Sequence, residues 1–143
     1  MVSRENLVIV SSFVLLVLAL AGIGIVDGAT TVALGEYPLV MYLLFAGLTI
    51  VGPQLYLAAT DDDVPPRTRV RFATIVWGLF ALVMADVSRA EAVLGSGILG
   101  ADLETLQHLA ILAIGGGAFV ALVCHEFVAG YRSQETDESQ SAR

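Results

Sequence analysis

Three ionisable residues in the second half of the chain have the types and spacing of a small polar site. Asp86 and Arg89 stand at i and i+3, which places them on nearly the same face of a helix. His108 follows at the start of the next apolar stretch. A carboxylate beside an imidazole can relay protons or bind a cation, because histidine titrates near neutral pH and burial tunes both groups. The same pair also forms structural hydrogen bonds, so its meaning depends on the elements that carry it.

Those elements are four long apolar stretches, at about 7–26, 38–60, 72–94 and 105–127. With 57% hydrophobic residues, 15% charged residues and a mean hydropathy of +0.81, the chain lacks the polar surface that a soluble globule of this size needs. A helix of ~20 apolar residues crosses the ~30 Å of bilayer hydrocarbon and satisfies its own backbone hydrogen bonds. The sequence therefore predicts an all-α membrane protein, an antiparallel four-transmembrane-helix bundle that forms one domain over residues 1–132.

The basic residues predict the orientation of this bundle. The chain contains no lysine, and its seven arginines stand against fourteen acids. Those that precede the first stretch, lie between the second and third, or follow the fourth are Arg4, Arg67, Arg69, Arg71, Arg132 and Arg143. Because all but one arginine fall on this side, the positive-inside rule predicts that both termini are cytoplasmic in a multi-pass protein of the cell membrane. Residues 133–143 have almost no apolar side chains, which predicts a disordered acidic tail.

A cleaved signal peptide is the alternative interpretation of the first stretch. Arg4 would supply the basic region before it, and the small residues Ala19 and Ala21 would supply the cleavage site. The apolar core of a signal peptide is about 7–15 residues long, whereas this apolar run continues to Val26. The sequence therefore favours an uncleaved membrane span.

The length of the third stretch places the candidate polar site within the membrane. The uncharged run from Phe72 to Ala85 covers only ~21 Å as a helix, so we expect Asp86 to be drawn into the hydrocarbon. A charge at this depth costs ~2.5–3.5 kcal/mol, and an ion pair with Arg89 reduces that cost. The fourth stretch begins on the same side, which brings His108 to a comparable depth. Either these residues form an ion or proton pathway, or a salt bridge only fixes the depth of the helix.

Small residues and one proline predict where the helices approach each other. Ala113, Gly117 and Ala121 recur every fourth residue in the fourth stretch, and Ala81 and Ala85 do so in the third. Such faces let membrane helices pack closely, so we expect these two helices to pack together. A proline inside a span frees backbone groups, which predicts a kink in the second stretch and leaves a substrate site there as an alternative. The positions predicted to serve packing or as a hinge are Gly52, Pro53, Gly115, Gly116 and Gly117.

Several functional classes do not fit the residues present. The single Cys124 cannot supply the paired cysteines of a quinone-linked four-helix oxidoreductase. His108 and His125 lie roughly 25 Å apart along one helix, which excludes a haem held between two histidines at one depth. The aspartates at 61–63 are adjacent on a loop and are interpreted as solvated charge. With no nucleophile beside a base and no set of metal ligands, the sequence predicts a protein that is not an enzyme and holds neither cofactor nor metal.

The acid excess and the replacement of lysine by arginine resemble the composition of proteins from salt-loving archaea. In size, number of spans and acidity, the chain is similar to small membrane proteins of haloarchaea and to the four-span internal envelope proteins of pleomorphic haloarchaeal viruses. The resemblance implies a structural or accessory membrane subunit, or a viral envelope protein. A small ion or proton pathway through Asp86, Arg89 and His108 is the alternative. Expected partners are the lipid bilayer and other membrane subunits or a second copy of the chain, with no nucleic acid.

Overall fold

The computed structural model describes residues 3–61 and 63–141, and the side chains at 92, 94, 96 and beyond Tyr131 lie outside that description. Every regular element in the described residues is helical. The elements are α1 (Arg4–Ala29), η1 (Leu34–Glu36), α2 (Pro38–Ala46), η2 (Gly47–Val51), α3 (Gly52–Thr60), α4 (Pro66–Met84), α5 (Val87–Ser96), η3 (Ile98–Gly100), α6 (Leu103–Ile111), η4 (Leu112–Gly116) and α7 (Gly117–Ser141).

Three continuous helices in the described part are long and apolar enough to cross a membrane. They are α1, the helix Pro38–Thr60 formed by α2, η2 and α3, and the stretch Leu103–Tyr131 formed by α6, η4 and most of α7. The prediction of an all-helical chain with apolar helices of membrane length is therefore confirmed. Helix α4 differs from these three, because Arg67, Arg69 and Arg71 occupy its first two turns.

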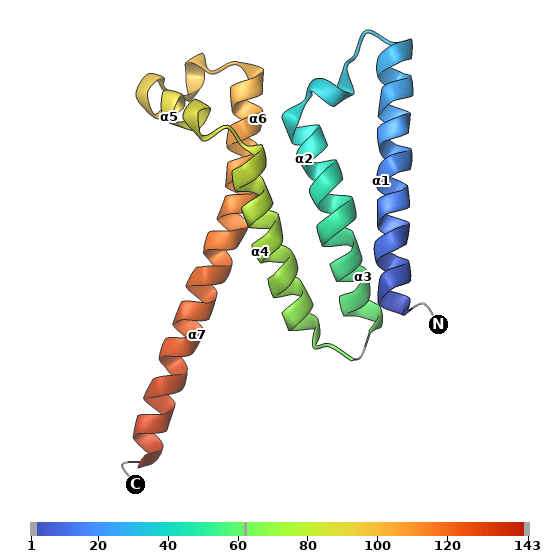
Figure 1. The fold of residues 1–143 in the computed structure, drawn as a ribbon. Helices are drawn as coiled ribbons and strands as arrows, with labels where there is room; N and C mark the ends of the chain where they lie inside the picture. Colours follow the sequence, from blue (N-terminus) through green and yellow to red (C-terminus); the bar gives the residue numbers. More distant parts are fainter. Residues whose placement is uncertain (1–2, 62, 142–143) are drawn as a thin grey trace.

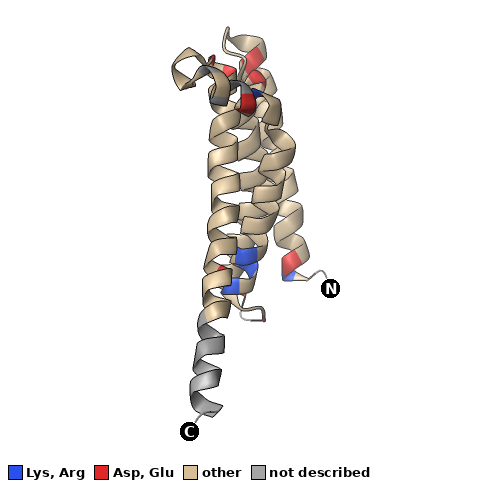
Figure 2. Ribbon diagram, turned by 90° about the vertical axis from the view of Figure 1, so that its left-hand side faces the viewer, with Lys and Arg blue, Asp and Glu red and all other residues tan. Residues whose placement is uncertain are grey.

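The long helices run alternately up and down and follow the chain order in space (Figure 1). α1 contacts α2, η2 and α3, α4 packs against α3 and against α7 with η4, and α2 also contacts α6. Figure 2 shows the side view, in which basic residues gather toward the lower end and acidic residues toward the upper. We call the end that holds Arg4, Arg67, Arg69 and Arg71 the arginine end and the other the α5 end. α1 begins at the arginine end, and α7 runs toward this end and extends past it (Figure 1).

The third apolar stretch is not one helix, and this corrects the predicted span 72–94. α4 ends at Met84, Ala85 is extended with φ −84° and ψ 137°, and a separate helix, α5, begins at Val87. The reason is local, since Asp86 caps the new helix by accepting a hydrogen bond from the Ser88 backbone N–H. α5 turns aside at the top of the structure and does not continue the line of α4 (Figure 1).

The last helix continues beyond the predicted fourth span. α7 reaches Ser141, which takes it into the segment 133–143 that the sequence predicts to be a disordered tail. The side chains from Arg132 onward lie outside the described residues. The state of the acidic tail therefore stays a prediction.

Both long helices that flank α4 contain a wide π turn near their middle. One is η2, which ends two residues before Pro53, and its wider turn lets the Gly52 N–H donate to the Gly47 carbonyl oxygen. Proline has no N–H to continue the regular ladder, so an irregular turn beside it has a clear cause. The other is η4, which contains Gly115 and Gly116. α4 contacts both π turns, so the irregular backbone faces the central helix.

A small apolar core lies where α2, α4 and α6 meet. Its buried residues are Tyr42, Ala46, Ala81, Ala85 and Ile111. The ring of Tyr42 stacks on Trp77 and Phe80, with centroid distances of 6.4 and 6.1 Å. Its hydroxyl donates to the Trp77 carbonyl oxygen at 3.3 Å, which satisfies a polar group in an apolar setting. One aromatic side chain thus fixes the spacing between α2 and α4.

Glycine is required at one position of the predicted triple-glycine run. A Cβ at Gly115 would lie within 3.0 Å of the Ala81 methyl group and of the Tyr42 hydroxyl, whereas one at Gly116 or Gly117 would meet nothing within 4 Å. Of the two predicted small-residue faces, the one on α4 is buried. The other is wrong, because Ala113, Gly117 and Ala121 are all exposed. The close contact uses the adjacent face of the same helix.

Replacing Gly115 and Gly117 separately by alanine tests this contact. Both changes add the same methyl group and the same gain in helix propensity, but only Gly115→Ala forces α4 or Tyr42 to move. We expect Gly115→Ala to lower the free energy of unfolding by about 1–3 kcal/mol. Gly117→Ala should leave it unchanged or slightly higher. Thermal unfolding of the two variants in detergent measures the difference, and equal melting temperatures would contradict the assignment.

Candidate functional site

The structure brings the three sequence-predicted residues together at the α5 end. Arg89 lies between two acids, with its Nε 3.3 Å from Asp86 Oδ2 and its Nη2 3.0 Å from Glu104 Oε1. Nδ1 of His108 accepts a hydrogen bond from the Asp86 backbone N–H at 3.1 Å. The start of α5 is thereby tied to α6, through Glu104 in its first turn and His108 in its last. Glu104 belongs to this group although the sequence analysis did not select it.

Asp86 and His108 meet through the backbone and not through the carboxylate. The Asp86 carboxylate faces its own helix, where it accepts from the backbone N–H and the hydroxyl of Ser88. The imidazole nitrogen that faces Asp86 is already occupied as an acceptor. A direct carboxylate–imidazole relay, one of the two interpretations offered by the sequence, therefore has no contact in this arrangement. The contacts that are present cap and join helices.

The charge of Asp86 is stabilised where it stands. The hydrogen bonds from Ser88 are the main cause that lowers the pKa of this carboxyl, and Arg89 adds to the effect. A lowered pKa means that the cap stabilises the fold above the ordinary value of 3.8 and that this contribution is lost as the pH falls through the folded-state pKa. Asp102 behaves alike at the start of α6, where hydrogen bonds from Thr105 lower its pKa. Both residues act as ionised helix caps at neutral pH.

A second polar contact at the α5 end joins α6 to α2. Gln107 and His108 are both 8% exposed, and Gln107 Oε1 accepts from the Leu39 backbone N–H at 3.2 Å. This N–H belongs to the first turn of α2, where backbone donors have no partner within the helix. Gln107 therefore caps a neighbouring helix by a side chain from another part of the chain.

An ionic contact with a buried guanidinium lies at the opposite end of the molecule. Arg69 is 5% exposed, and its guanidinium pairs with Asp61 and with Glu5 Oε1, the latter at 3.2 Å. Beside it, Arg4 Nη1 donates to the Thr60 carbonyl oxygen at 3.0 Å. These contacts join the start of α1, the end of α3 and the start of α4. A buried guanidinium is costly unless it is paired, so this site fixes three helix ends at one level.

This contact corrects part of the interpretation of the aspartates at 61–63. Asp61 is not simply solvated, because its carboxylate is paired with the buried Arg69 and accepts the Asp63 backbone N–H at 3.2 Å. Residue 62 lies outside the described part. Asp63 is exposed and fits the prediction.

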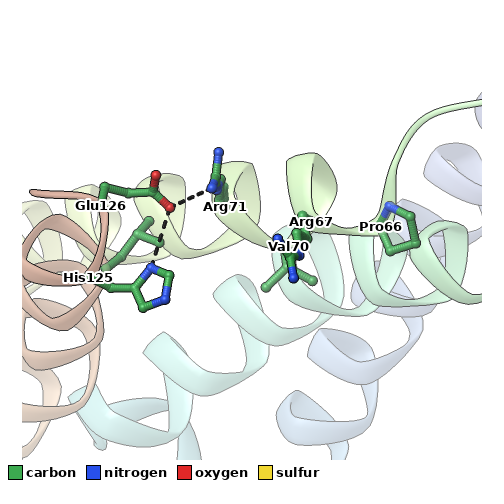
Figure 3. A pocket seen from close by; sticks show the side chains of 7 residues that line it. Pro66, Arg67, Val70, Arg71, His125 and Glu126 are labelled. Atoms are coloured by element: carbon green, nitrogen blue, oxygen red, sulfur yellow. Dashed lines mark ion pairs between the residues drawn. The ribbon is translucent and has the colours of Figure 1, made fainter. Parts of the chain in front are cut away.

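A groove between α4 and α7 carries the other arginines of this end (Figure 3). It has a volume of about 410 Å³ and is lined by Pro66, Arg67, Val70, Arg71, Leu122, His125 and Glu126. Arg71 Nη2 pairs with Glu126 Oε1 at 2.8 Å, and His125 Nδ1 lies 3.7 Å from the same oxygen. The side chain of His125 is 75% exposed.

Helical spacing carries the signal that divides these arginines. Arg67 and Arg71 stand at i and i+4 and share one face, which the structure turns toward α7. Arg69 stands two residues away, about 200° around the helix, and reaches α1 and α3 instead. Counting charges alone predicts the membrane side and misses this division.

Comparisons with known proteins add no identification. No family model, no curated protein and no solved structure matches the chain. Among the described residues, no group of three or more His, Cys, Asp or Glu side chains is placed to hold a metal ion. The functional argument therefore rests on the contacts themselves.

Arg69→Gln tests the buried ionic contact. The change removes the partner of Asp61 and Glu5 and leaves a buried polar group, so we expect it to lower the free energy of unfolding by about 3 kcal/mol. The matched control is Arg67→Gln, an exposed position two residues away, which should change stability by less than about 0.5 kcal/mol. Chemical or thermal unfolding in detergent compares the two. Similar values for both variants would show that Arg69 does not hold the helices together.

Proposed function

We propose that this chain is a small integral membrane protein with a structural or accessory role and no enzymatic activity. One observation carries the proposal. The polar residues selected as a candidate site act as helix caps and as ties between helices at the α5 end. Between that end and the arginine end lies an apolar core. Such an arrangement favours a scaffold over a pathway, since conduction needs polar groups along the whole depth.

The proposed topology has four spans, with α4 as the third, and both termini in the cytoplasm. α4 has 19 residues and a length of ~28 Å. Its first turns carry three arginines and are proposed to lie in the interface, so the apolar part that crosses the membrane is shorter than an ordinary span. The arginines of these turns are two ion-paired side chains and one exposed one, an arrangement compatible with a headgroup region. The positive-inside rule supports the cytoplasmic assignment of this end.

The surface of α1 suggests what an accessory subunit offers to its surroundings. Leu16 is its only buried residue, and its exposed apolar side chains run along the length of the helix. In a bilayer this surface faces lipid or the helices of another subunit. The composition keeps a haloarchaeal membrane as the proposed setting, in a cell or in the envelope of a virus.

Cysteine labelling tests the four-span topology. In a Cys124→Ser background, Asp63→Cys lies just before α4 and Glu91→Cys lies in α5 after it, so the two should fall on opposite sides of the membrane. An impermeant maleimide should label Glu91→Cys in intact cells and Asp63→Cys only after permeabilisation. Labelling of both from outside would show that α4 does not span.

Substitution of Asp86 tests the structural role against an ion or proton pathway. Asparagine caps a helix nearly as well as aspartate, so Asp86→Asn should keep the melting temperature, whereas Asp86→Ala should cost about 1 kcal/mol. Vesicles that contain the parent protein should show no more proton or cation flux than empty vesicles. A flux that is present in the parent and abolished by Asp86→Asn would overturn the structural role and favour the pathway.

A further inference from the structure

The groove between α4 and α7 at the arginine end is lined by both basic and apolar side chains. The proposed scaffold role does not explain this lining. Arg67 of α4 and His125 of α7 lie toward the arginine end of the groove. Val70 and Leu122 lie closer to the middle of the molecule, because α4 runs away from this end and α7 runs toward it. Arg71 follows Val70 along α4, but its charge is paired with Glu126. A ligand that fills the groove would therefore meet an unpaired charge at one end and apolar side chains toward the other.

The charges of the groove select an anion. Arg71 and Glu126 neutralise each other as an ion pair. Arg67 is exposed and forms no ion pair within the described residues, which do not include its neighbour at position 62. It leaves one uncompensated guanidinium over the groove, in a chain whose net charge is -7. A guanidinium suits a phosphate oxygen because its planar N–H groups can donate to two oxygens together.

The location of the groove at the side of the bundle favours an anionic lipid over other anionic ligands. α4 and α7 diverge toward the arginine end (Figure 1). The groove lies between the diverging helices and would face the lipid at the side of the bundle. This face of α4 carries basic and apolar side chains in sequence. They are Arg67, Val70 and Arg71, and each is exposed or half-exposed. Basic pockets between membrane helices on the cytoplasmic side are sites for anionic headgroups. An acyl or isoprenoid chain would continue along Val70 and Leu122 into the bilayer.

We propose that this groove binds the phosphate headgroup of an anionic phospholipid, with Arg67 as its main ligand and Leu122 and Val70 against the start of the lipid chain. Arg71 contributes less to phosphate binding, because its guanidinium is already paired with Glu126. The proposal goes beyond the scaffold role by naming a ligand. It rests on the same membrane setting, but the test below uses protein in detergent and is independent of topology and flux.

Native mass spectrometry of the full chain in detergent tests the proposal. The probes are phosphatidylglycerol and phosphatidylcholine with identical chains. We expect phosphatidylglycerol to be retained preferentially, and R67Q to weaken that retention about five-fold, since one arginine near a membrane surface contributes about that factor. The matched control is R4Q, which removes an arginine of the same end that is bonded to the Thr60 carbonyl outside the groove. R4Q should leave retention as in the parent.

Other outcomes overturn the proposal. Equal losses in R67Q and R4Q would mean that only general surface charge attracts the lipid, and equal retention of both lipids would remove the phosphate argument. Displacement of phosphatidylglycerol by millimolar inorganic phosphate would assign the groove to free phosphate. Arg67 is exposed, so R67Q should fold, and an unchanged melting temperature confirms this. Leu122→Gln tests the apolar part of the groove separately. It should reduce lipid retention although Arg67 is intact.

Discussion

Tyr42, Ala81 and Gly115 meet at one point, where a hydroxyl and a methyl group occupy the space that a side chain at position 115 would need. This contact sets the separation of α2, α4 and α6–η4 together, because each of the three helices supplies one partner. The hydrophobic effect contributes little to helix association in lipid, so the association depends on close van der Waals contact. The stacked rings of Trp77 and Phe80 extend the same contact along α4. The positions of the polar groups at both ends follow from the spacing that is established here.

The polar contacts at the two ends then fix how the helices stand relative to one another along their length. At the arginine end, Arg69 holds the starts of α1 and α4 and the end of α3. At the α5 end, Gln107 and His108 bind backbone N–H groups of α2 and of the α4–α5 junction. Surface ion pairs such as Arg89–Glu104 contribute little energy, whereas contacts of buried side chains define a single arrangement. Polar residues thus determine how the helices align along their length, and small residues determine how closely the helices approach each other.

The sequence was sufficient for what depends on composition and length, and insufficient for what depends on orientation around a helix. Hydropathy predicts the helical class and the apolar helices, because the cost of unsatisfied backbone in lipid leaves few alternatives. The break at Asp86 was missed although the signal was present, since a short uncharged run followed by Asp-Val-Ser is also the pattern of a helix cap. Alanine and glycine spacing suggested Gly117, but small residues are compatible with lipid as well as with a neighbour. The burial of Arg69 depends on partners distant in sequence, Glu5 and Asp61, which no local pattern connects.

The break after Met84 has a consequence for the membrane around the protein. Between Arg71 and Ala85 the uncharged part of α4 covers only ~20 Å, against the ~30 Å of an ordinary hydrocarbon layer. α4 cannot slide to share this shortfall between the two leaflets, because Arg69 holds it at one end and the hydrogen bond from the Asp86 backbone N–H to His108 holds it at the other. In the proposed topology the bilayer itself must adjust, by thinning beside α4 while it keeps its usual thickness along the longer α1. A small protein of this kind would impose a local gradient of thickness and would favour membrane regions that are already thin.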